Sequence, residues 1–117
     1  MKYVITQTSK LIGPDRLVYR IASVSGELGG FVESSKNLSQ IGECWLHGDS
    51  VVIGNAQVTE DAQIYGLVEE QAQIGGQAQV FGRVYGSAVI GGFVKIYGSV
   101  GGNVSLLGNE VIYGTLP

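Results

Sequence analysis

The amino-acid sequence predicts an all-β protein: one short parallel β-helix, in which short strands stack along an axis, with a β-hairpin cap at its N-terminal end. The main observation is a 16-residue period. It appears in four aligned segments: AQVTEDAQIYGLVEEQ (56–71), AQIGGQAQVFGRVYGS (72–87), AVIGGFVKIYGSVGGN (88–103) and the shorter VSLLGNEVIYGTLP (104–117). Within each segment apolar residues alternate with polar ones, and glycine returns at fixed places. Such a period is typical of stacked repeat coils.

The cap and its link to the first coil are expected in residues 1–37. KYVITQT and RLVYRIASV have the composition of two strands, and the turn between them falls at Gly13-Pro14-Asp15. The segment GELGGFVESSKNLSQIGECW then leads into the repeats. We therefore expect the coils to occupy residues 38–117.

The repeat predicts which side chains point inward. We number its positions 1 to 16 from Ala56. Apolar residues fill position 1 (Ala56, Ala72, Ala88, Val104), position 3 (Val58, Ile74, Ile90, Leu106), position 7 (Ala62, Ala78, Val94, then Glu110), position 9 (Ile64, Val80, Ile96, Ile112) and position 13 (Val68, Val84, Val100, Leu116). Alternate residues of a strand face opposite sides, so these positions face a dry interior, in strands of about four residues.

Glycine marks the corners of the coil. Position 11 is glycine in every copy: Gly66, Gly82, Gly98 and Gly114. Positions 4 and 5 add further glycines. Since only glycine adopts positive φ without steric cost, we expect the chain to turn at these positions.

Composition narrows the functional classes. Nineteen glycines accompany 44% apolar residues, which indicates repeated turns in a folded chain. Residues 1–40 carry five basic and three acidic side chains, whereas residues 41–117 carry two basic and seven acidic ones. An acidic array does not favour direct nucleic-acid binding. The single cysteine, Cys44, and the lack of an apolar leader or membrane-spanning run are consistent with a cytoplasmic protein.

The small inward residues are spaced by 6, 6 and 4, as in Ile74-Gly75-Gly76-Gln77-Ala78-Gln79. This pattern resembles the hexapeptide repeat of left-handed parallel β-helix proteins over residues 38–117. The resemblance implies about five left-handed coils, and a right-handed coil remains open. One side is two residues shorter than in that family, so we expect a smaller or distorted cross-section. The first coil keeps the full turn, because Leu38, Cys44, Ser50 and Ala56 are six apart.

Over its whole length the chain also resembles small hexapeptide proteins of prophages and bacteria. The features in common are the N-terminal hairpin, the GGFVES link with NLSQ, the Cys44-Trp45 pair and the Gly-Asn-Ala phrases. Members of this group are described as transferases or polymer-forming proteins. The resemblance implies a phage or prophage origin, in which inhibition of a host or competitor protein would be a reasonable role.

An aromatic residue precedes each position-11 glycine: Tyr65, Phe81, Tyr97 and Tyr113, with His47 in the equivalent place of the first coil. We expect these rings to stack as a ladder on one outer edge, with Tyr85 widening the patch. Ladders of this kind stabilise repeat folds, and exposed tyrosines also dominate protein-binding surfaces. Both roles remain open.

His47 is also the candidate catalytic base if the protein is an enzyme. The hexapeptide acyltransferases that the repeat resembles use a histidine base together with acyl-CoA. No insertion interrupts residues 56–117 to form a substrate loop, and the sequence places no second polar group beside the ring. We therefore interpret His47 as a member of the ladder.

Acidic residues cluster in residues 56–71, as Glu60 with Asp61 and Glu69 with Glu70. They fall at two separate corners, so they do not predict a metal site. They are either solvated corner charges or part of an acidic surface that engages a basic partner.

The C-terminal end carries a candidate self-association patch of Val111, Ile112, Tyr113 and Leu116. Glu110 occupies an inward position there and is interpreted as a signal against further stacking.

Taken together, these features predict a non-enzymatic module that binds another protein, or its own copies as a dimer or trimer, with no cofactor and no metal. The alternatives are an acyl-CoA-dependent acyltransferase and a self-assembling structural protein.

Overall fold

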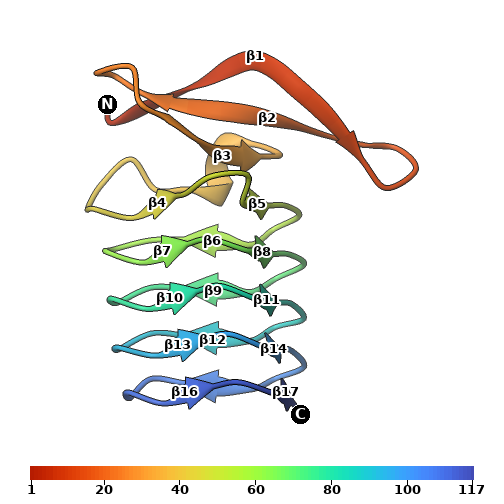
Figure 1. Cartoon of the computed structure of the whole chain (residues 1–117), viewed down its shortest axis with the longest axis vertical. Coiled ribbons are helices and arrows are strands. Elements are labelled where there is room, and N and C mark those ends of the chain that lie inside the picture. Colours follow the sequence, from red (N-terminus) through yellow and green to blue (C-terminus); the bar gives the residue numbers. More distant parts are fainter.

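The computed structural model describes all 117 residues, and it confirms the predicted stack of parallel coils with an antiparallel hairpin at the N-terminal end (Figure 1). Three sheets form the sides of the coil. Sheet A contains β1 (Tyr3–Ile12), β2 (Arg16–Ser23), β3 (Leu28–Val32), β5 (Val51–Val52), β8 (Leu67–Val68), β11 (Arg83–Val84), β14 (Ser99–Val100) and β17 (Thr115–Leu116). Sheet B contains β6 (Gln57–Val58), β9 (Gln73–Ile74), β12 (Val89–Ile90) and β15 (Ser105–Leu106). Sheet C contains β4 (Trp45–Leu46), β7 (Gln63–Ile64), β10 (Gln79–Val80), β13 (Lys95–Ile96) and β16 (Val111–Ile112).

The coil is left-handed. In Figure 1 the nearer strands β7, β10 and β13 run to the right, and the fainter, more distant β6, β9 and β12 run to the left as the chain descends. Each strand pairs in parallel with the strand 16 residues later, as Gln63 does with Gln79 and Gln79 with Lys95. The only helical element is the 3₁₀ turn η1 (Ser35–Asn37), and no helix is long and apolar enough to cross a bilayer.

The strands contain two residues, fewer than the four expected, because a corner follows each inward side chain at once. Only Tyr65 and Gly66 separate β7 from β8, which is the short side that the spacing predicted. In the first coil, four residues separate β4 from β5, so this coil keeps the longer side.

The inward positions form one continuous core along the axis. Its members are buried from Leu38 and Cys44 in the first coil to Val94, Ile96 and Val100 near the last. The predicted inward positions are therefore confirmed.

The N-terminal end of this core is closed by the hairpin. The turn joining β1 to β2 lies at the predicted residues, and Tyr3 and Ile21 are buried above the first coil. The Tyr3 hydroxyl donates to the Leu38 carbonyl at 2.5 Å, which ties the cap to that coil.

Strand β3 was not predicted, because paired glycines are unusual inside a strand. It pairs antiparallel with β2 and parallel with β5, so it joins the hairpin to sheet A. Its glycines allow close packing: a Cβ on Gly29 would lie 2.8 Å from Ile21 and Trp45 side-chain atoms, and one on Gly30 would overlap Ser50.

The reason given for the position-11 glycines was wrong. None of Gly66, Gly82, Gly98 and Gly114 has positive φ; this conformation occurs instead at Gly76 and Gly92 in position 5 and at Gly54, Gly86 and Gly102 in position 15. Position 11 requires glycine because a Cβ on Gly66 or Gly82 would overlap the carbonyl oxygen of the next coil's glycine.

Candidate functional site

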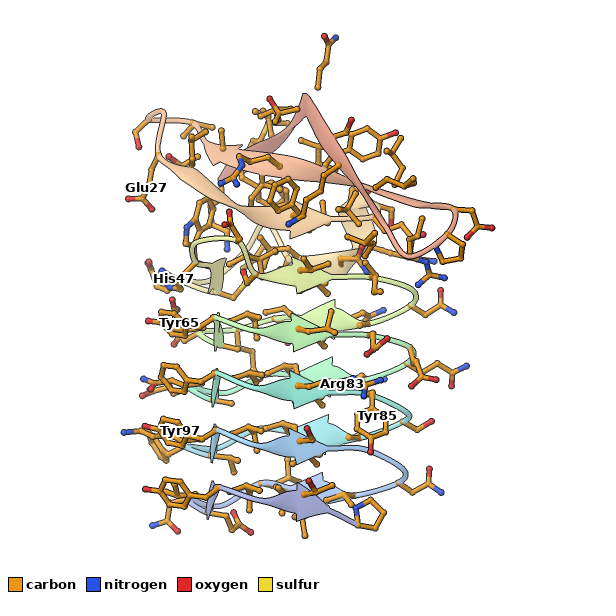
Figure 2. All side chains as sticks on the ribbon, turned by 45° about the vertical axis from the view of Figure 1, so that its right-hand side comes forward. Glu27, His47, Tyr65, Arg83, Tyr85 and Tyr97 are labelled. Atoms are coloured by element: carbon orange, nitrogen blue, oxygen red, sulfur yellow. The ribbon has the colours of Figure 1, made fainter.

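The predicted aromatic ladder is confirmed as a continuous stack along one edge of the coil (Figure 2). Its five rings are His47, Tyr65, Phe81, Tyr97 and Tyr113, and we use "aromatic ladder" for these residues. Successive ring centroids are 4.4, 4.7, 4.8 and 5.2 Å apart, with interplanar angles of 10° or less. The spacing follows the rise between coils, because each ring leaves the backbone at the same corner, between sheets C and A.

The stack determines what the ladder offers to solvent. Tyr65, Phe81 and Tyr97 are 44%, 37% and 45% exposed, whereas Tyr113 at the end is 77% exposed. Because neighbouring rings cover one another's faces, the inner rings present their edges, which carry partial positive charge, and the tyrosines also present hydroxyl groups. Only the outer face of Tyr113 is free to stack.

A groove lies beside the ladder, between the hairpin turn and the outer face of sheet A. It holds about 500 Å³ and is lined by Ile12, Val51, Leu67 and Tyr65, among others. Figure 1 shows the hairpin extending sideways past β5 and β8, which creates this overhang. Sequence reasoning missed the groove, since it depends on the angle of the hairpin to the coil.

The hairpin is held in this position by a second, small core. Val18, Phe31 and Ile53 are buried together on the outer side of sheet A. Two cations flank the Phe31 ring: Lys10 Nζ lies 4.2 Å and Arg20 Cζ 4.4 Å from its centroid. The overhang is therefore a packed part of the fold.

Tyr85 does not widen the ladder. Figure 2 shows it on a different side of the coil from Tyr65 and Tyr97. Its ring lies over Gly101 and beneath Arg83, whose Cζ is 4.3 Å from the ring centroid. The 16-residue period explains the difference, because position 14 lies beyond sheet A whereas position 10 precedes it.

The four acidic residues lie at corners away from the ladder, and each carboxylate has a partner within the chain. Glu60 and Glu70 accept hydrogen bonds from the amides of glycines in the next coil, at 2.8 and 3.0 Å. Asp61 accepts from the Glu43 amide, and Glu69 forms an ion pair with Arg83. These contacts indicate that the carboxylates stabilise the corners, and we leave them out of the candidate site.

His47 lies at the N-terminal end of the ladder, near Glu27 of the β2–β3 turn (Figure 2). Its Nε2 is 2.6 Å from Gln63 Oε1, and Gln63 in turn donates to the carbonyl oxygens of Glu43 and Asp61. The expectation that no polar group accompanies the ring was therefore wrong. The partner comes from the next coil, 16 residues later in the chain.

The predicted self-association residues lie in the last coil, where Val111 is exposed and Ile112 and Leu116 are half-buried against the core. Glu110 is exposed, and its Oε1 accepts from the Gly108 amide at 3.1 Å. The interior position thus turns toward solvent at this end of the coil.

No group of three or more His, Cys, Asp or Glu side chains in the chain is arranged to hold a metal ion. Comparison with known proteins gave no matching family model and no matching curated protein.

Proposed function

We propose that this protein is a binding module that engages another protein through the aromatic ladder and the groove beside it. The observation that carries the proposal is the continuity of the two, since Tyr65 belongs to the ladder and also lines the groove. We call this combined surface, formed by the ladder with Ile12, Val51 and Leu67, the ladder face.

The rigidity of the ladder supports this role. Each inner ring is held between two neighbours at less than 5.3 Å. A side chain that is already fixed loses little conformational entropy when a partner covers it, so more of the contact free energy contributes to affinity. Tyrosines presented in this way are the residues on which protein interfaces most often depend.

The ladder face also indicates the chemistry of its partner. Ring edges and three tyrosine hydroxyls favour hydrogen-bond acceptors, and the groove residues Ile12, Val51 and Leu67 favour an apolar side chain. We therefore propose a protein segment that places an apolar anchor under the hairpin and carbonyl or carboxylate oxygens along the ladder. Inhibition of a host or competing-phage protein is the narrower form of this proposal, and it rests on the sequence resemblance.

The test is affinity capture from a host lysate with three tagged proteins: wild type, Tyr97→Arg and Phe93→Arg. Phe93 is the matched control, because it is an exposed aromatic residue of the same coil at another corner. We expect one protein, recovered near one-to-one, with wild type and Phe93→Arg, and at least tenfold less with Tyr97→Arg. Circular dichroism checks that all three are folded. Equal recovery with Tyr97→Arg, or equal loss with Phe93→Arg, would contradict the proposal.

The second candidate is the acyltransferase. Its supporting observation is the contact between His47 Nε2 and Gln63 Oε1, because a catalytic base needs a group that orients its ring. Calorimetric titration with acetyl-CoA tests it, with His47→Phe as the variant that keeps a ring in the ladder. Saturable binding by both proteins, with turnover only by wild type, would favour the enzyme. Our proposal expects no saturable binding.

A further inference from the structure

The two ends of the coil differ. At the N-terminal end sheet A continues into the hairpin, and Tyr3 and Ile21 cover the core. At the C-terminal end all three sheets stop in the same coil, and their last strands, β15, β16 and β17, are edge strands with no cover (Figure 1). Natural proteins usually protect such edges, because unpaired strands recruit other strands.

The backbone of the last coil shows what these edges lack. In each earlier repeat the amide groups at even positions donate to the coil that follows, as Gln79 does to Val94 and Lys95 to Glu110. The equivalent amides of the last coil belong to Ser105, Leu107, Asn109, Val111, Tyr113 and Thr115, and none of them donates a hydrogen bond within the chain. Six donors therefore face outward around one closed perimeter.

Apolar groups lie inside this perimeter and beside it. Val104, Leu106, Ile112 and Leu116 pack against the core and are only partly buried, whereas their equivalents in the preceding coil are fully buried. Tyr113 has one ring face with no neighbour, which accounts for its 77% exposure. The end of the coil thus has the cross-section of a core with its last layer missing.

We propose that this end binds the same end of a second copy of the chain, which gives a two-fold symmetric dimer joined through the C-terminal coils. Turning one coil upside down reverses the direction of its strands, so the edge strands of the two copies meet antiparallel. In an antiparallel pair, residues that face each other exchange both their N–H and C=O bonds, and the even-position residues of the last coil have these groups free.

Two features favour a second copy over a longer stack. The hairpin covers the other end, so head-to-tail addition has no site to join. Glu110 occupies an inward position, where a parallel coil laid directly below would enclose its carboxylate. A self-complementary contact between identical ends closes after two chains. The contact is the cross-section of one coil, which is small for an interface, so we expect a reversible equilibrium with Kd of roughly 1–100 µM.

The experiment is sedimentation equilibrium of the full chain from low to high micromolar concentration, with small-angle scattering of the heaviest species. We expect a monomer–dimer equilibrium built on the 12.3 kDa chain, with no larger species. The dimer should be about twice as long as the 36 Å monomer, because it grows along the coil axis.

Ser105→Pro is the decisive variant, since it removes an amide that no group of the same chain uses and leaves the pairing of β15 with β12 in place. It should raise the dimer dissociation constant at least tenfold and keep the monomer's circular dichroism. Leu116→Glu, which adds a charge at the open end, should do the same. Tyr97→Arg should dimerise like wild type, which separates this proposal from the ladder face.

A wild-type protein that stays monomeric throughout, or that grows beyond two chains, would overturn the proposal. So would a dimer that keeps its affinity in both Ser105→Pro and Leu116→Glu, or one no longer than the monomer.

Discussion

A Cβ atom on Gly66 would overlap the carbonyl oxygen of Gly82 in the next coil. The same relation joins Gly82 to Gly98 and Gly98 to Gly114, whereas Gly114 has open space beside it because no coil follows. These glycines leave the short side of the coil flat, and the preceding aromatic rings stack directly above one another.

Substitution of Gly82 by alanine should destabilise the protein by about 3 kcal/mol or more, because the backbone of two coils must separate to admit the methyl group. Gly114→Ala makes the same chemical change without that overlap and should shift stability by less than about 0.5 kcal/mol. Urea unfolding of dilute samples measures both. Equal effects of the two substitutions would contradict the close-approach explanation.

Glu70 has a φ of 63°, in the place of a repeat where Gly54, Gly86 and Gly102 stand. Glu70→Ala should cost about 1 kcal/mol, because the strained backbone remains while the hydrogen bond to the Gly86 amide is lost. Glu70→Gly loses the same bond and relieves the strain, so its stability should lie within about 0.5 kcal/mol of wild type. Thermal unfolding of the three proteins decides; a glycine variant less stable than the alanine variant would refute this account.

Phe81 stacks on two neighbours, and Tyr113 stacks on one. Phe81→Ala should therefore destabilise by about 2 kcal/mol and Tyr113→Ala by about half as much. Chemical unfolding gives the free energies, and near-ultraviolet circular dichroism reports the stacked rings. If neither variant changes stability, the ladder contributes nothing to the fold and its conformation must be maintained by the coil alone.

Burial, with a smaller contribution from Cys44, raises the pKa of the Tyr3 phenol above its ordinary value of 10.0. A folded-state pKa above the unfolded value stabilises the protein fully below pH 10 and progressively less as pH rises toward the folded pKa. The stability of wild type should therefore fall above pH 10 by more than that of Tyr3→Phe. Tyr3→Phe should also cost about 1 to 2 kcal/mol at pH 7, because it removes the donor to Leu38. Parallel stability curves for the two proteins above pH 10 would contradict the assignment to Tyr3.

The coil was predictable from sequence because its signals are periodic. Inward positions such as Val80 and Ile96 repeat every 16 residues, and so do Phe81 and Tyr97 of the ladder, so one turn of the pattern implies the next. The positive φ of Glu60 and Glu70 gave no such signal, since a carboxylate in a glycine position becomes understandable only when its bond to the next coil is seen.

The groove was not predictable, because its walls come from unrelated segments. Ile12 belongs to the hairpin, whereas Val51 and Leu67 belong to two coils, and no period connects the hairpin to the coils. The contact of His47 with Gln63 was missed for a related reason. The first coil contains two more residues than the others, so its alignment with the next coil becomes certain only from the strand pairing of Trp45 with Gln63.

The constant register between coils has an evolutionary consequence. Because Gln63, Gln79 and Lys95 pair in one unbroken column, duplication of any internal 16-residue segment would insert one more layer without disturbing the layers on either side. The gene can therefore change the length of the ladder in single steps while both ends stay as they are. Relatives of different lengths would then share the same two ends and differ only in how far apart those ends lie.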